Sequence, residues 1–174
     1  LLASEREKLR MTFGIPSNAR VVMFVGRFIE KKCVSLLIEA FARASFEGPI
    51  VLALLGDGPQ RRRLEDHADS LGIGEQVLFP GFMSPRELPT WFAASDLFVL
   101  LSSETWGVAP IEAVASGLPV VVSNDAGCAD DLRCLVGDKC RITDSKDPDE
   151  IGELISESLR CADRVGLSEE SDLD

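Results

Sequence analysis

The amino-acid sequence predicts an α/β fold in which helices cover both faces of a doubly wound parallel sheet. Apolar runs typical of buried strands alternate with segments of helical periodicity, and the connections between them are short. The chain has 174 residues, of which 45% are hydrophobic, enough for one well-packed domain and marginal for two. We therefore expect a single domain over 1–174, with its core at about 18–163 and an acidic tail at 164–174.

The first part of the chain predicts a helix followed by two strand–helix units. Residues 4–15 are charged and helical in pattern, and 19–28 form an unbroken apolar run, as in strands buried on both faces. Apolar residues recur at helical spacing over 34–44. The alternation then repeats, with a strand at 49–56 and a helix at 58–72.

The middle of the chain continues the same pattern. A strand at 75–81 leads into a helix at 84–95, whose entry carries a serine and a proline. A buried strand at 96–102 precedes a short helix at 110–116, and a run of valines predicts the next strand at 118–123.

The pattern after residue 123 is less regular. Residues 139–145 are consistent with a last edge strand, and 148–162 form an amphipathic helix. Right-handed crossovers between parallel strands would bring the carboxyl ends of the strands to one edge of the sheet, where such sheets bind ligands.

Charge and composition exclude several classes of function. The net charge of −11 argues against a general nucleic-acid surface, because phosphate binding depends on Lys and Arg. No stretch approaches the roughly 20 apolar residues that span a bilayer, and no secretory leader is evident. The sequence opens within a helix and lacks an initiator methionine, so we expect a piece of a longer, cytoplasmic protein.

The cysteines predict reduced, mostly buried thiols rather than a metal site. None of the five belongs to a C-x-x-C pair, and the single histidine, His67, is far in sequence from the evenly spaced Cys128, Cys134 and Cys140. A lone histidine without a nucleophile motif also argues against a hydrolytic triad. We expect no metal and no bound cofactor.

Charged and glycine residues follow the predicted strands. Gly26, Arg27 and Lys32 come after the first strand, where the two cations would bind a diphosphate unless they are ordinary surface charges. The "GDGP" turn at 56–59 resembles part of a dinucleotide fingerprint, but Arg61 stands at its third glycine position. We interpret that turn as a tight strand-to-helix connection.

The helix at 110–116 presents a predicted anion-binding end. Pro110 suits its first turn, and Gly117 suits its end. The helix would begin near Ala109, so that the amides of Gly107, Val108 and Ala109 face a ligand. Gly107 would let that ligand approach the backbone without a clash.

Two glutamates flank this helix start. Taken alone, Glu112 in the first helical turn would favour the helix dipole, and Glu104 would be a solvated loop carboxylate. Together at the ligand edge they suggest recognition of hydroxyl groups. Cations, free amides and hydroxyl-binding carboxylates in one crevice describe a site for a nucleotide sugar.

The chain resembles the C-terminal, donor-binding half of retaining glycosyltransferases of the GT-B fold, in particular glycosyltransferase family 4, also known as group 1. The resemblance covers about 10–160. It rests on "FVGRFIEKK" (24–32), "LLIEAF" (36–41), "LLGDGPQRRRLE" (54–65) and the segment 77–123, in which Glu104 and Glu112 form an E-x7-E motif.

The resemblance implies roles for individual residues. Arg27 and Lys32 would bind the donor diphosphate and stabilise the leaving group as catalytic residues. Glu104, also catalytic, and the amide of Gly107 would contact the donor sugar. Glu112 would bind the ribose. The backbone of Val108 and Ala109 would reach sugar and phosphates, and the loop at Phe82 and Met83 would lie beside the base.

The family's chemistry implies transfer of a sugar with retention of configuration and without a metal. UDP-sugars are the expected donors, with GDP- and ADP-sugars as alternatives, and the acceptor would be a glycan, a lipid or a small molecule. An acceptor-binding N-terminal domain is missing, so we expect this chain to bind donor without transferring sugar. Any peripheral membrane association would reside in that missing half.

Two features depart from the family pattern. Cys33 stands where a glycine usually follows the lysine, and the segment 126–140 replaces one that often carries a Gly-Gly step and an acidic residue. Two alternatives therefore stay open: a non-catalytic nucleotide-binding or regulatory module derived from such a domain, and a structural interaction domain without a ligand.

Overall fold

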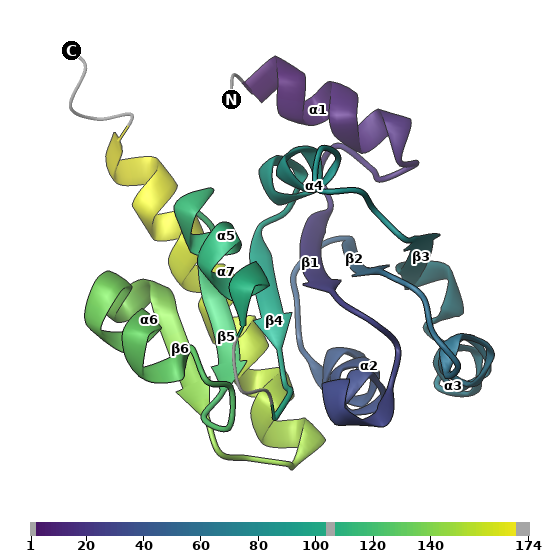
Figure 1. The fold of residues 1–174 in the computed structure, drawn as a ribbon. Coiled ribbons are helices and arrows are strands. Elements are labelled where there is room, and N and C mark those ends of the chain that lie inside the picture. Colours follow the sequence, from purple (N-terminus) through teal and green to yellow (C-terminus); the bar gives the residue numbers. More distant parts are fainter. Residues whose placement is uncertain (1–2, 104–106, 170–174) are drawn as a thin grey trace.

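The computed structural model describes residues 3–103 and 107–169, and it confirms the predicted α/β fold (Figure 1). One sheet of six parallel strands has the order β3-β2-β1-β4-β5-β6. The strands are β1 (Arg20–Val25), β2 (Ile50–Leu55), β3 (Val77–Gly81), β4 (Leu97–Leu100), β5 (Val120–Ser123) and β6 (Cys140–Thr143). This order is that of doubly wound nucleotide-binding sheets, with its switch point between β1 and β4.

The described residues also form seven α-helices and three 3-10 turns. The helices are α1 (Ala3–Thr12), α2 (Val34–Arg43), α3 (Arg61–Ser70), α4 (Leu88–Ala94), α5 (Val108–Ala115), α6 (Ala129–Val136) and α7 (Pro148–Glu169). The 3-10 turns are η1 (Glu30–Lys32), η2 (Gly74–Gln76) and η3 (Gly137–Lys139). Helices α2, α3 and α7 pack together on one face, α4, α5 and α6 cover the other, and α1 lies on α4.

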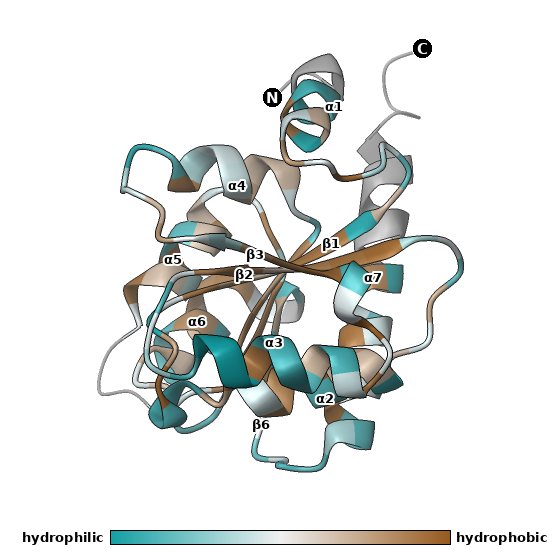
Figure 2. Cartoon of the chain, turned by 90° about the vertical axis from the view of Figure 1, so that its right-hand side faces the viewer, coloured by the Kyte–Doolittle hydropathy of each residue, from teal (hydrophilic) through white to brown (hydrophobic). Residues whose placement is uncertain are grey.

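The core lies between these helix layers and the central strands. The side chains of β1 from Val21 to Phe24 are 0% exposed, as are those of Val120 to Val122 in β5. Figure 2 shows the apolar residues concentrated along the strands and the hydrophilic ones on the outer sides of the helices. Burial on both faces explains why these strands are unbroken apolar runs rather than alternating ones.

The structure differs most from the sequence prediction at three helices. Helix α6 was not predicted. Helix α4 begins at Leu88 rather than at residue 84, and the residues before it form a turn in which the Ser84 N–H donates to the Glu87 carboxylate at 2.8 Å. Helix α7 runs to Glu169, into the segment that we expected to be an acidic tail.

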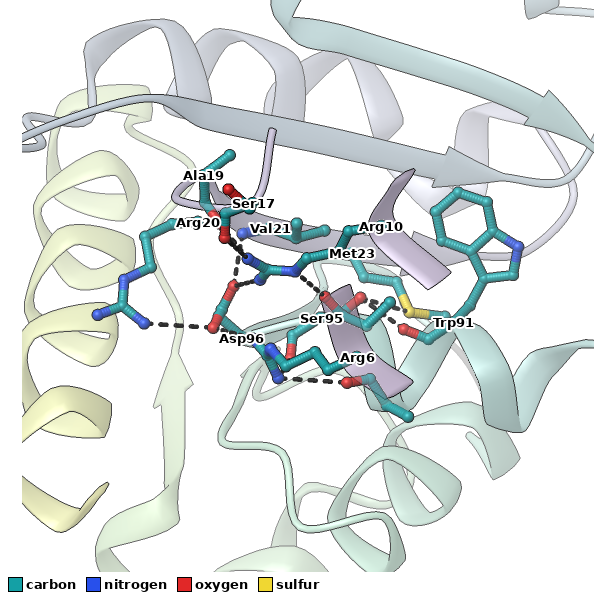
Figure 3. A network of polar contacts seen from close by, with 12 residues as sticks. Arg6, Arg10, Ser17, Ala19, Arg20, Val21, Met23, Trp91, Ser95 and Asp96 are labelled. Carbon is teal, nitrogen blue, oxygen red and sulfur yellow. Dashed lines mark hydrogen bonds and ion pairs between the residues drawn. The ribbon is translucent and has the colours of Figure 1, made fainter. Parts of the chain in front are cut away.

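A buried ion cluster anchors α1 at the amino ends of β1 and β4, far from the edge where ligands are expected (Figure 3). Arg6, Arg10 and Arg20 all pair with the carboxylate of Asp96, whose side chain is 6% exposed. Arg10 also donates to the carbonyl oxygens of Ala94 and Ala19. Burial lowers the pKa of Arg10, and Asp96 opposes this effect. The Val21 N–H also donates to the Asp96 carboxylate, which is therefore fully hydrogen-bonded. Through this carboxylate the cluster joins α1 to the start of β4.

Within residues 3–103 and 107–169, no helix combines the length and the apolar content that crossing a bilayer requires.

Cys33 has the one left-handed conformation among the described non-glycine residues, with φ +50 and ψ +35. It joins η1 to α2 directly after Lys32. A side chain in the left-handed region destabilises the folded state by about 1–2 kcal/mol. Substitution by glycine recovers only part of this energy, because glycine loses more conformational entropy on folding. We expect Cys33→Gly to raise the free energy of unfolding by about 0.5–1 kcal/mol in urea titrations. Cys33→Ala keeps the penalty and should give no such gain; an equal gain would contradict this account.

Candidate functional site

The loops that leave β1, β2 and β3 form a cleft at the carboxyl edge of the sheet. Its volume is about 360 Å³. The lining residues are Val25, Gly26, Arg27, Gly56, Asp57, Phe82 and Met83. The cleft therefore lies where parallel sheets of this strand order bind ligands.

Glycines hold these loops together. The Gly26 N–H donates to the Leu55 carbonyl at 2.9 Å, and the Gly56 N–H donates to the Gly81 carbonyl at 2.8 Å. Gly56 has φ +140, and a Cβ on it would lie 1.9 Å from the carbonyl oxygen of Gly26. The "GDGP" segment is therefore the tight strand-to-helix turn that the sequence predicts, packed directly on the first loop.

Gly56→Ala is expected to lower the free energy of unfolding by about 1–3 kcal/mol or more, because the new Cβ would push apart the loops that follow β1 and β2. Gly14→Ala is the matched control. Gly14 also has a positive φ, +69, but a Cβ there meets nothing within 4 Å, so only the backbone penalty of about 1 kcal/mol remains. Equal losses in chemical denaturation would show that the close approach to Gly26 is unimportant.

Arg27 and Lys32 both lie at the carboxyl end of β1. Arg27 is exposed and lines the cleft. The half-buried Lys32 folds back over the strand end, since a Cβ on Gly26 would lie 3.6 Å from the Lys32 Nζ. Burial, and secondarily the charge of Lys31, lowers the pKa of Lys32. A partly desolvated ammonium interacts more strongly with an anion than one in water does.

The amino end of α5 follows the neighbouring strand. β1 and β4 pair through Val22↔Leu97 and Met23↔Phe98, so their carboxyl ends lie at the same level. Gly107 is the N-cap of α5, and Val108 and Ala109 are its first residues. Val108 is 56% exposed. These amides lie in the first turn, where backbone N–H groups have no partner within the helix.

The position of Glu112 corrects one expectation. The helix begins at Val108, one residue earlier than predicted, and its first turn, which is wholly described, contains no acidic residue. Glu112 is therefore an exposed residue of the second turn. The helix dipole favours acidic residues only within the first turn, so it does not account for Glu112. Glu104 lies outside the described residues.

The structure brings only some of the predicted site residues into one cleft. Arg27 and Met83 line it, and Lys32 lies above Gly26 beside it. Val108, Ala109 and Glu112 are carried by α5 and do not line this cleft. Asp57, which was not among the site residues predicted from the sequence, is an exposed carboxylate of the cleft. It lies between two glycines, and its Oδ1 accepts from the Gly58 N–H at 2.7 Å.

The cysteines and the potential metal ligands differ in how they are placed. All five cysteines are free, but the expectation of mostly buried thiols is wrong: Cys128 is buried, Cys33 and Cys140 are half-buried, and Cys134 and Cys161 are exposed. Within the described residues, no three His, Cys, Asp or Glu side chains are grouped so that they could hold a metal ion.

The chain is similar to known proteins over almost its whole length. The family model described as glycosyl transferases group 1 matches residues 5–170. The D-inositol 3-phosphate glycosyltransferase of Corynebacterium urealyticum is 32% identical over 178 residues, which cover 94% of this chain and 40% of that protein. The lipopolysaccharide core biosynthesis glycosyltransferase LpsE of Rhizobium meliloti is 39% identical over 128 residues, 73% of this chain and 35% of that protein.

A solved structure agrees with these relatives. HepE of Anabaena, in complex with UDP and glucose, has a TM-score of 0.78 at 27% sequence identity, over 88% of this chain and 42% of that chain. This chain spans between 26% and 44% of the length of the curated relatives that it matches. The matched family model, the relatives and the fold together show that the chain belongs to the glycosyl transferases of group 1.

Proposed function

We propose that this domain is the donor-binding half of a retaining glycosyltransferase, which transfers a sugar from a nucleoside-diphosphate sugar to an acceptor. The observation that carries the proposal is the pair of cations at the carboxyl end of β1 together with the first-turn amides of α5, which follows the neighbouring strand β4, at the switch point of the sheet. Family membership supports it, as does the presence of UDP and glucose in the related HepE structure.

The residues of the site suggest how they would act. Arg27 and Lys32 would hold the diphosphate and stabilise the negative charge that grows on it as the sugar departs. The amides of Gly107, Val108 and Ala109 would add fixed dipoles aimed at the phosphates and sugar. Because cations and amides would supply this stabilisation, we propose a reaction that needs no metal.

The remaining groups would set the orientation of the donor. Glu104 would contact hydroxyls of the sugar and Glu112 those of the ribose, while Met83 would lie beside the base. UDP-sugars are the donors that we propose first, with GDP- and ADP-sugars as alternatives. One relative, from Mycolicibacterium smegmatis, is named as GDP-mannose-dependent. GDP-sugars therefore stay among the donors that we propose.

We further propose that these 174 residues bind donor and transfer no sugar by themselves. The chain spans less than half of its curated relatives, and an acceptor-binding domain would complete the catalytic cleft. The complete protein would act in the cytoplasm, and any association with the cytoplasmic membrane would come from that other domain.

Titration calorimetry with UDP, GDP, ADP and uridine tests the proposal. We expect one diphosphate to bind and uridine to bind far more weakly, because most of the recognition is of phosphate. Sugar transfer by the same chain, measured with a UDP-sugar, should be absent. A folded chain that binds none of the diphosphates would contradict the proposal. Binding of the diphosphate by a full-length protein that lacks transferase activity would favour a non-catalytic module.

The lowered pKa of Lys32 predicts a pH dependence of diphosphate binding. The protonated ammonium is the form that attracts phosphate, and burial reduces its proton affinity in the free protein. The affinity for UDP should therefore fall as the pH rises, beginning below the usual range of a lysine. Lys32→Arg should remove this loss, because a guanidinium stays protonated throughout. A wild-type affinity that is constant up to pH 10.5 would contradict the prediction.

A further inference from the structure

Cys128 lies directly against the amino end of α5. Its side chain is 0% exposed, at the N-cap of α6. A Cβ placed on Gly107 would lie 2.8 Å from the Cys128 Sγ. Atoms in close-packed interiors do not approach so closely, so the thiol fills the space in which any side chain at position 107 would stand.

The backbone of Gly107 does not itself require glycine. Its φ of −125 and ψ of 98 are extended values that other residues adopt. The next nearest atoms to such a Cβ are ring carbons of Pro110 at 3.5 Å, an ordinary contact. The lack of a side chain at 107 is therefore a packing requirement that the Cys128 thiol imposes.

The thiol acts here as a packing group. Burial raises the pKa of Cys128, and Asp131 adds to this effect. Burial, with a contribution from Cys128, also raises the pKa of Cys140 to about 11. Both thiols stay protonated at neutral pH and are poor nucleophiles, and a protonated thiol behaves as a small apolar side chain.

We propose that Cys128 is a positioning residue for diphosphate binding: its sulfur sets the position of the Gly107–Ala109 backbone, whose amides would face the phosphates. This inference rests on the proposed function. A displacement of these amides would lengthen their hydrogen bonds to the phosphates and so weaken binding. The contact explains why the N-cap residue of α5 is a glycine.

A double-mutant cycle between positions 107 and 128 tests the inference. The dissociation constants of UDP, GDP and ADP are measured for the wild-type chain, Gly107→Ala, Cys128→Ala and the double variant, at a temperature where all four are folded. We expect Gly107→Ala to weaken the binding of the tightest of the three nucleotides about 10-fold or more, as for the loss of one hydrogen bond to a charged group. Adding Cys128→Ala should remove the clash and restore the affinity to within about 3-fold of wild type.

Two further variants separate positioning from general stability. Cys128→Ser keeps an atom at the γ position and should stay within about 3-fold of wild-type affinity. Cys134→Ala, which removes an exposed thiol from α6, should leave the affinity unchanged. Melting temperatures, measured in parallel without nucleotide, show whether a loss of affinity merely follows a loss of stability.

Two results would overturn the inference. If the wild type binds nucleotide but the double variant binds no better than Gly107→Ala, the positioning role of Cys128 is overturned and the proposed function is not. A wild-type chain that binds none of the three nucleotides would overturn the proposed function, and the positioning role with it.

Discussion

Arg27→Ala and Lys32→Ala are each expected to weaken UDP binding about 10- to 100-fold, because a hydrogen bond to a charged group contributes about 1.5–3 kcal/mol. Arg27 lines the cleft, and the Lys32 ammonium lies against the end of β1 in a partly desolvated position. Each loss should appear in calorimetric titrations with UDP and be small with uridine, which carries no phosphate. In a full-length protein, sugar transfer should fall further, by about 100- to 1,000-fold, if these cations also stabilise the leaving group.

Lys31→Ala is the matched control for this prediction. Lys31 precedes Lys32 in the same 3-10 turn, but it is exposed and does not line the cleft. Its removal lowers the local positive charge by the same amount as the removal of Lys32, but it leaves the Lys32 ammonium beside Gly26 in place. We expect a change of no more than about 3-fold, as for a screened surface charge. Equal losses for Lys31 and Lys32 would show that general electrostatics, rather than a site, binds the nucleotide.

Asp96→Asn is expected to lower the free energy of unfolding by about 3–5 kcal/mol, since removing one partner of a buried pair leaves uncompensated charge. Asparagine keeps the shape of the side chain, so the loss would report on charge and hydrogen bonding. Three guanidinium groups would face a neutral amide, and that of Arg10, with a side chain 5% exposed, would be buried without a carboxylate. Chemical denaturation of the wild type and the variant measures the difference.

An exposed ion pair provides the control for the Asp96 prediction. Asp130 and Arg133 pair on the surface of α6, with side chains that are 89% and 60% exposed. Asp130→Asn should change the free energy of unfolding by less than about 1 kcal/mol. If Asp96→Asn costs no more than this, the cluster does not anchor α1 in the way that we describe.

The sequence predicted the parts of the fold that depend on local pattern. All six strands were predicted. The four central strands β1, β2, β4 and β5 are buried on both faces and so form continuous apolar runs such as residues 21–24, whereas the edge strands β3 and β6 are only partly buried. Gly117, with φ +88, closes α5 as expected. The site loops could be located because parallel strands all end at the same edge.

The rest depends on contacts between distant parts of the chain. The pairing of Asp96 with α1 joins residues 86 to 90 positions apart, and no local pattern indicates it. The same holds for Gly56 against Gly26 and for Cys128 against Gly107, where the requirement for glycine arises from a neighbour. Helix α6 was missed because its eight residues bury only Ala129 and Leu132, too few to show a helical period.

The most direct test of the donor site is amide chemical-shift mapping of the 174-residue chain during a titration with UDP. We predict that the perturbed amides cluster at the carboxyl edge of the sheet, at 26–32, 56–57, 82–83 and 107–109, whereas those around Arg10 and Asp96 at the opposite edge stay unchanged. Saturable shifts at the carboxyl edge would support the donor site. Shifts confined to the opposite edge, or no saturable shifts for UDP, GDP or ADP with a folded protein, would contradict it.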